Sequence, residues 1–296
     1  MAIVSSSNLP SIAQRDLSNV FLNKYRDIPS MLPLIYSFKK AEQGTEYDLE
    51  MGDIPAVGEF DGSVSYPSFA EGYKQGVSET EYAQGLQLTR RLMRNDLYGA
   101  VRNRTGLLAQ NFRHLRETVG ASAFVNGFSS FRTGDGLSLF NSAHTSKNGG
   151  ANQSNTSSLA LSAANLFTNL LAMKKLKTNV DNIMTNIPDM LIVPMDRAEV
   201  AYEIISSSGK VDVSTNNRNY HEGKYKLVVW DNYLSSTTQC FLVNSSMMKD
   251  HLLFREWEPV QFIRDGEINS LTTKLVGYTS FAVSSVEWRW GFAFNP

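Results

Sequence analysis

The side chains best suited to catalysis or metal binding are four histidines and one cysteine, and their spacing supports neither chemistry. No HExxH motif or comparable ligand spacing occurs among His114, His144, His221 and His251. Cys240 is the single cysteine, which excludes an internal disulfide and a zinc site built from several cysteines. Because it lies in an apolar run, we expect it to be a small buried residue of a strand.

The other candidates for a reactive site are equally weak. Ser142 and His144 are two residues apart in a polar loop, and such a pair is not a nucleophile–base arrangement. No Walker phosphate loop and no GxSxG motif occurs. Trp288 and Trp290 could stack on nucleobases, but only Arg289 adds a positive charge beside them, so we expect both rings in the core. The sequence therefore predicts a protein that is not an enzyme and needs no cofactor or metal.

The longest element predicted from the sequence is a helix from Asn95 to about Asn126. Asn95 is the expected N-cap, Asp96 favours the positive end of the helix dipole, and Gly127 follows the last turn. At about 1.5 Å per residue this rod is roughly 45 Å long, and we expect it to be the spine of the fold. Its apolar stripe, at spacings of three or four residues or a multiple, contains Leu97, Val101, Leu108, Phe112, Leu115 and Val119.

Shorter elements flank this helix. A helix from Ser11 to about Tyr25 is ended by prolines, and we expect it to be an arm and not a core element. Two strands at 47–51 and 73–77, joined by a long loop, predict either an extended hairpin that gains its burial from another subunit or a disordered surface insertion. Residues 141–158 are rich in Ser, Asn and Gly and predict an exposed, mobile loop.

The C-terminal half alternates helices with strands. Helices are predicted after Ser162, which caps the first of them, and after Asp196. Separated helices and antiparallel-looking strands give the α+β class. The strands are predicted near 190–193, 224–230, 239–243, 259–263 and 272–283, with a last aromatic segment at 288–292.

In the order of these elements the chain resembles the major capsid proteins of tailed bacteriophages, nearest the Mu-type major head subunit. The segments that carry the resemblance are 52–62 (GDIPAVGEFDG), 73–81, 92–99 (LMRNDLYG) and 135–144 (DGLSLFNSAH). The resemblance implies the capsid fold of tailed phages and herpesviruses. Its parts would be an N-terminal arm (1–40), an extended β-hairpin loop (41–86), a peripheral domain with the spine helix (87–140), an axial domain (141–252) and a return to the peripheral domain (253–296).

The same resemblance implies a structural function. The chain would assemble into pentamers and hexamers of an icosahedral head that encloses double-stranded DNA. Its partners would be further copies of itself, scaffolding, portal and decoration proteins, and packaged DNA bound without sequence specificity. It would be found in the virion, and in the host cytoplasm during assembly. Two alternatives stay open: an encapsulin-like nanocompartment shell, and a hydrolase using Ser142, Cys240 or a histidine.

The net charge is only −1, so the chain as a whole carries no positive charge that would attract nucleic acid. Acidic and basic residues are nevertheless concentrated in different segments. Residues 41–81 contain ten acids and one lysine, whereas 90–116 contain seven arginines and one acid. We expect the acidic loop of one subunit to cross the basic segment of the next, where many weak pairs would set register. The residues predicted to make these contacts are Glu46, Asp48, Glu50, Asp53, Glu59, Asp61, Arg90, Arg91, Arg94, Arg102 and Arg104. No apolar run approaches the ~18 residues needed to span a bilayer, so no membrane partner is expected.

Overall fold

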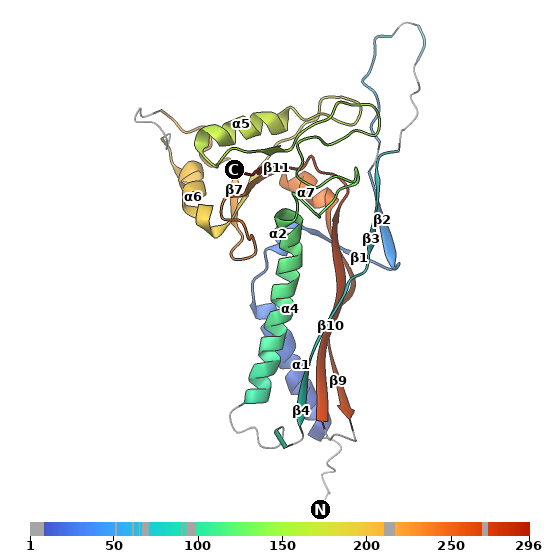
Figure 1. Cartoon of the computed structure of the whole chain (residues 1–296), viewed down its shortest axis with the longest axis vertical. Coiled ribbons are helices and arrows are strands. Elements are labelled where there is room, and N and C mark those ends of the chain that lie inside the picture. The colour runs from blue at the N-terminus through green and yellow to red at the C-terminus, as the bar shows by residue number, and fades with distance from the viewer. Residues whose placement is uncertain are drawn as a thin grey trace, which may run out of the picture.

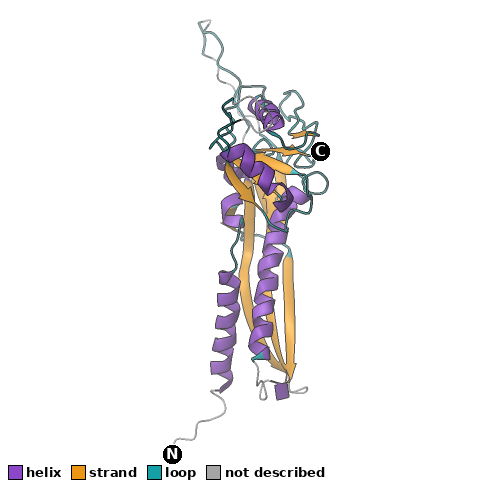
Figure 2. Cartoon of the chain, turned by 90° about the vertical axis from the view of Figure 1, so that its left-hand side faces the viewer, coloured by secondary structure: helices purple, strands orange, loops and turns teal. Residues whose placement is uncertain are grey.

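The protein has an elongated body, a lobe at one end of it, and a hairpin whose loop reaches beyond the lobe (Figures 1 and 2). The computed structural model describes residues 9–50, 52–60, 62–64, 66, 71–89, 91–92, 99–209, 217–267 and 272–296. The predicted mixture of helices and largely antiparallel strands is confirmed.

The body is built on a four-stranded sheet in the order β1–β9–β10–β4. Its long strands are β9 (Leu252–Glu267) and β10 (Thr272–Ser285), which pair antiparallel. β4 (Glu81–Thr89) pairs antiparallel with β10, and the short β1 (Ser37–Lys40) pairs parallel with β9. The strand β4 was not predicted, although Tyr82, Leu86 and Leu88 alternate with exposed residues as they do in a half-buried strand.

Helices α1 (Leu9–Asp27) and α4 (Ala100–Val125) pack together on one face of this sheet. Phe21 of α1 meets Phe112 of α4 edge to face, with 6.1 Å between ring centroids, and lies 5.0 Å from the ring of Phe262 on β9. Gly277 of β10 permits this close approach, because a Cβ there would lie 2.3 Å from the Phe112 ring. Since Leu17 and Phe21 are buried, the expectation that this helix stays outside the core is wrong.

The long helix is present but begins later than predicted. Its N-cap is Gly99, whose φ of 65° is left-handed, so Asn95 does not cap α4. Asn95, Asp96 and Leu97 lie outside the described residues. The 26 residues of α4 give a length of about 39 Å at about 1.5 Å per residue.

The lobe contains a five-stranded sheet in the order β5–β11–β8–β6–β7. Strands β6 (Met190–Val193) and β8 (Cys240–Val243) are buried throughout, as their apolar sequences predict. The others are β5 (Thr156–Ser157), β7 (Lys226–Val229) and β11 (Gly291–Phe294). The helices of the lobe are α5 (Ala163–Lys174), a 3₁₀ turn η1 (Met195–Arg197) leading into α6 (Ala198–Ser206), and α7 (Ser245–His251).

Body and lobe share one hydrophobic core. Near the C-terminal end of α4, the Phe124 ring lies 5.1 Å from Phe241, 5.8 Å from Trp230 and 5.9 Å from Trp290. The same cluster of buried residues continues to Tyr36, just after the short helix α2 (Leu32–Ile35). The lobe is therefore seated on the end of the long helix.

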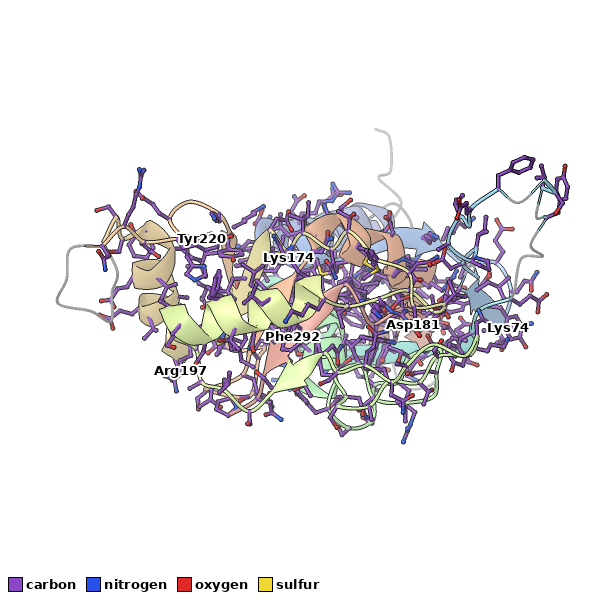
Figure 3. The ribbon with its side chains drawn as sticks, turned by 90° about the horizontal axis from the view of Figure 1, so that it is seen from above. Lys74, Lys174, Asp181, Arg197, Tyr220 and Phe292 are labelled. Carbon is purple, nitrogen blue, oxygen red and sulfur yellow. The ribbon has the colours of Figure 1, made fainter. Side chains whose placement is uncertain are left out.

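The predicted hairpin is present as β2 (Thr45–Leu49) and β3 (Lys74–Ser78), which pair antiparallel from Thr45↔Ser78 to Leu49↔Lys74. The connecting loop extends past the lobe (Figure 1). Seen from above, Lys74 of the hairpin and Tyr220 beside α6 lie at opposite ends of the lobe (Figure 3).

Candidate assembly interface

Three of the acids predicted to contact a neighbouring subunit are paired within their own chain. Asp48 is 7% exposed and forms an ion pair with Arg255 of β9, and it also accepts a hydrogen bond from the Ser284 hydroxyl at 2.7 Å. Glu46, on the same face of β2, lies 3.9 Å from the Arg255 guanidinium. This cluster attaches the hairpin to the sheet of the body, and we call it the Arg255 latch.

Glu50 forms a second attachment at the base of the loop. One of its oxygens accepts from Asn179 Nδ2 at 2.5 Å and the other from the Tyr73 backbone N–H at 3.0 Å. Arg289 lies 3.5 Å from Glu50 and 2.8 Å from Glu287, so two carboxylates share one guanidinium. Burial, and secondly the neighbouring Glu287 charge, raise the pKa of Glu50 above its usual range.

The other predicted contact residues are divided between the loop and the long helix. Asp53 is half-buried and Glu59 exposed in the loop, and Arg102 and Arg104 are exposed near the start of α4. Arg91 is described and exposed, whereas Asp61, Arg90 and Arg94 lie outside the described residues. Whether these side chains meet another subunit stays a prediction.

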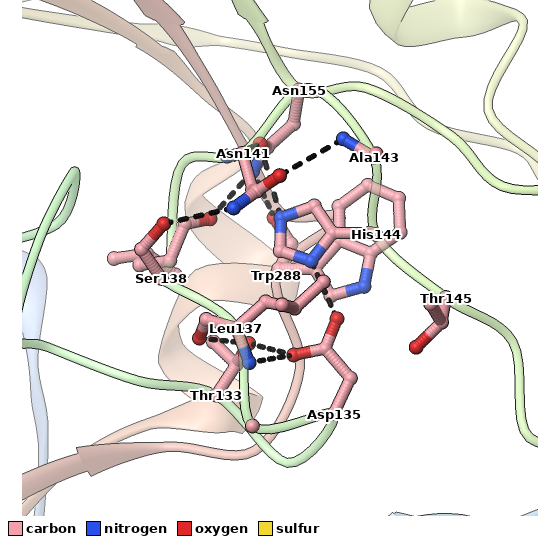
Figure 4. Close-up of polar contacts among 12 residues, drawn as sticks. Thr133, Asp135, Leu137, Ser138, Asn141, Ala143, His144, Thr145, Asn155 and Trp288 are labelled. Carbon is pink, nitrogen blue, oxygen red and sulfur yellow. Dashed lines mark hydrogen bonds and ion pairs between the residues drawn. The ribbon is translucent and has the colours of Figure 1, made fainter.

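The segment 141–158 is a largely exposed or half-buried loop, as expected, but His144 and Asn155 within it are buried in a hydrogen-bonded cluster (Figure 4). His144 is 1% exposed; its Nδ1 lies 2.6 Å from Asp135 and its Nε2 lies 3.2 Å from the Asn155 side-chain oxygen. Its ring stacks on Trp288 with centroids 4.0 Å apart. Burial alone would raise the pKa of Asp135, but hydrogen bonds from His144 and Thr133 and the charge of His144 hold that pKa below its usual range.

Ser142 and His144 do not form a nucleophile–base pair. His144 is buried with both ring nitrogens at hydrogen-bonding distance from protein oxygens, while Ser142 is exposed. Cys240 is buried in β8, as predicted, and this burial raises the pKa of its thiol to about 12. Both tryptophans, Trp288 and Trp290, are in the core, as predicted. Among the described residues, no cluster of His, Cys, Asp and Glu could hold a metal ion.

The comparisons with known proteins agree with this architecture. The family model described as phage capsid protein matches residues 72–293, which is 222 of the 296 residues. No curated protein matches. No helix in the described part of the chain is long and apolar enough to cross a membrane.

Solved capsids share the fold at low sequence identity. The mature capsid of bacteriophage PhiM1 has a TM-score of 0.59 and 12% identity, over 90% of this chain and 87% of that one. The capsid of bacteriophage JBD30 decorated with minor capsid protein trimers has a TM-score of 0.58 and 12% identity, over 70% and 92%.

A virus-like particle from Pyrococcus furiosus has a TM-score of 0.55 and 10% identity, over 95% of this chain and 98% of that one. The nanocompartment alternative is not better supported than a capsid, and the family and fold imply a structural protein. Since the family model covers three quarters of the sequence, the chain belongs to the phage capsid protein family.

Proposed function

We propose that this chain is the major capsid subunit of a tailed phage of the Mu type, and that it forms pentamers and hexamers of an icosahedral head around double-stranded DNA. The observation that carries the proposal is the family match over 72–293. A body, a lobe and a projecting hairpin loop on one chain suit a subunit that overlaps its neighbours in a closed shell (Figure 1).

The parts of the fold have corresponding roles in this proposal. The arm is 1–40, the extended loop 41–86, the peripheral domain 87–140 with the return 253–296, and the axial domain 141–252. In support, α4 of the peripheral domain packs against β10 of the return segment. β4 joins the same sheet, although residues 81–86 of it belong to the extended loop as bounded here. The last strand, β11, instead pairs with β8 in the lobe, so the end of the chain also contributes to the axial part. Further partners would be scaffolding, portal and decoration proteins in the host cytoplasm, and DNA on the inner surface of the virion.

Assembly of the purified full chain tests this proposal. Light scattering after size exclusion and negative-stain microscopy should show rings and closed shells, with the phage's own scaffolding protein added where needed. A monomer that persists at high concentration under both conditions would contradict the function. Shells that recruit a cargo enzyme through a terminal peptide, and no nucleic acid, would favour the nanocompartment alternative.

Opposite charge contributes to register in the proposed shell. Glu59 is exposed in the loop and can cross an interface, whereas Asp48 and Glu50 are held within the chain and one Asp53 oxygen is buried. Reversing Arg90, Arg91 and Arg94 together to glutamate should block assembly while circular dichroism shows a folded monomer. Normal shells from this variant, at low and moderate salt alike, would exclude the charge contact. A rescue variant belongs at Glu59→Lys, since lysine at residue 48 would face Arg255.

A further inference from the structure

The sequence contains two Asn-Gly dipeptides, Asn126-Gly127 and Asn148-Gly149. In such a pair the backbone nitrogen of glycine can attack the side-chain carbonyl carbon of asparagine, because glycine has no side chain to hinder the approach. Both pairs carry the same chemistry, so the local structure decides which of them reacts. The fold places the two pairs in opposite surroundings.

Asn126 and Gly127 close the C-terminal end of α4, where the backbone is held on all sides. The Gly127 N–H donates to the Phe124 carbonyl at 3.3 Å. Gly127 is buried, and a Cβ on it would lie 2.6 Å from the Ala123 carbonyl oxygen and 2.7 Å from the Phe140 ring. The attacking nitrogen is therefore engaged in a hydrogen bond, and the packed backbone has no room to rotate into a cyclic imide.

Asn148 and Gly149 lie instead in a turn at the surface of the lobe. Gly149 is exposed, its φ is 86°, and a Cβ built on it would meet nothing within 4 Å. In the described part of the chain, the Asn148 side-chain nitrogen has no hydrogen-bond partner. The bond that deamidation breaks, between Cγ and Nδ2 of Asn148, is therefore not held by a contact, and the space beside Gly149 is open to the cyclic intermediate.

The same turn fastens the extended loop to the lobe. Lys147 Nζ donates to the Gly72 carbonyl at 2.8 Å, where the extended loop returns toward β3. The Gly150 N–H donates to Ser146 Oγ at 3.2 Å, and this hydroxyl donates to the Asn179 carbonyl at 2.6 Å. A change at residue 148 therefore acts between two contacts that hold the turn in place.

Deamidation changes the kind of group that the turn must bury. The Asn148 Nδ2 atom is buried. A neutral amide nitrogen tolerates such a position at moderate cost, whereas a carboxylate in its place is a charge that must be hydrated or paired. Hydration opens the turn, and pairing with the adjacent Lys147 draws that ammonium from the Gly72 carbonyl. Either response loosens the contact between the turn and the extended loop.

We propose that Asn148 is a site of spontaneous deamidation, and that its conversion releases the turn from the extended loop. The Gly149 nitrogen attacks Asn148 Cγ and forms the new N–Cγ bond of a cyclic imide. Nδ2 leaves as ammonia and takes the Gly149 amide proton with it. Water then opens the imide at either carbonyl, which gives aspartate or isoaspartate and adds one negative charge to the subunit. The reaction consumes only water.

Peptide mapping of the full chain by mass spectrometry tests the site, after incubation at neutral and at mildly alkaline pH. The peptide containing Asn148 should convert at least about tenfold faster than the peptide containing Asn126, because Asn126 reacts only when the end of α4 opens locally. Isoaspartate should accompany aspartate at residue 148, and the rate should rise with pH. In urea the two peptides should convert at similar rates, which is the matched control for the sequence.

Equal rates for Asn148 and Asn126 in the folded chain, or aspartate without isoaspartate, would overturn the site. Asn148→Asp reports the structural consequence, with Asn148→Ser as its neutral control. Hydrogen exchange of the segment 146–151, which contains the Gly150 N–H, should be several-fold faster in Asn148→Asp than in Asn148→Ser, and equal exchange would overturn the release of the turn. Both measurements are made on the subunit itself, so neither depends on whether shells form.

Discussion

The Arg255 latch should be costly to break, because both of its charged side chains are buried. Arg255 and Asp48 side chains are 9% and 7% exposed, and Arg255 Nε has no hydrogen-bond partner. In Arg255→Met, Asp48 would keep only the Ser284 hydroxyl, with Glu46 as a neighbouring like charge. An unpaired buried charge of this kind costs about 3–5 kcal/mol, so we expect a loss of that order in the free energy of unfolding.

The assay is denaturant unfolding of the unassembled subunit, followed by tryptophan fluorescence in a double-mutant cycle. Asp48→Asn should cost less than Arg255→Met, because Arg255 would retain Glu46. The double variant should be more stable than the sum of the two losses predicts, since it removes both buried charges. The matched control is Asp27→Asn, which breaks the exposed Lys24–Asp27 pair at 4.0 Å and should change stability by about 0–1 kcal/mol.

The reasoning is refuted if Arg255→Met is no more destabilising than the Asp27→Asn control. It is also refuted if the losses of unfolding free energy in the two single variants add up to the loss in the double variant. Additivity would mean that Asp48 and Arg255 do not stabilise each other. A latch variant that folds but assembles into shells of altered size would show, in addition, that the orientation of the hairpin determines the curvature of the shell.

Three other outcomes are expected. Gly277→Ala should lower the melting temperature because its Cβ would clash with Phe112, and the matched Gly266→Ala, with nothing within 4 Å, should not. Because the folded-state pKa of Glu50 is raised, the folded chain holds more protons than the unfolded chain between the two pKa values, and stability should fall as pH rises through that window. In Glu50→Gln, the denaturant midpoint should fall less steeply with rising pH than it does in the unmodified chain. An unchanged pH dependence would show that Glu50 does not contribute to it. Finally, we expect no covalent cross-links between subunits in mature particles, and a ladder in reducing, denaturing gels would overturn this.

Local patterns predicted most of the elements but not their long-range partners. The apolar spacing from Val101 to Val119 identified the long helix, and the apolar run at 190–193 identified a buried strand. By contrast, Asp48 and Arg255 are 207 positions apart in the sequence. No local pattern shows that an acid in a hairpin forms an ion pair with an arginine of a distant strand.

Composition also did not show that two residues of the segment 141–158, His144 and Asn155, are buried. Ser, Asn and Gly residues usually mark exposed loops, because their side chains compete for backbone hydrogen bonds. Here Asn155 is fully buried, and its amide donates to the backbone carbonyls of Leu139, Trp288 and Gly291. Its hydrogen bonds therefore connect segments that are far apart in the sequence. Composition alone does not distinguish a polar loop in water from a polar network in a core.

The seating of Phe124 in the lobe has a mechanical consequence. Two domains joined by a linker bend at the linker when they are loaded, but here the rings of Trp230, Phe241 and Trp290 surround a residue near the end of a continuous helix. A force applied to the lobe is therefore transmitted along α4 into the long sheet, and bending would require opening a close-packed aromatic core. Each subunit should therefore move as a rigid body. Any change in the shape of an assembly should occur at the contacts between subunits and where the hairpin is attached.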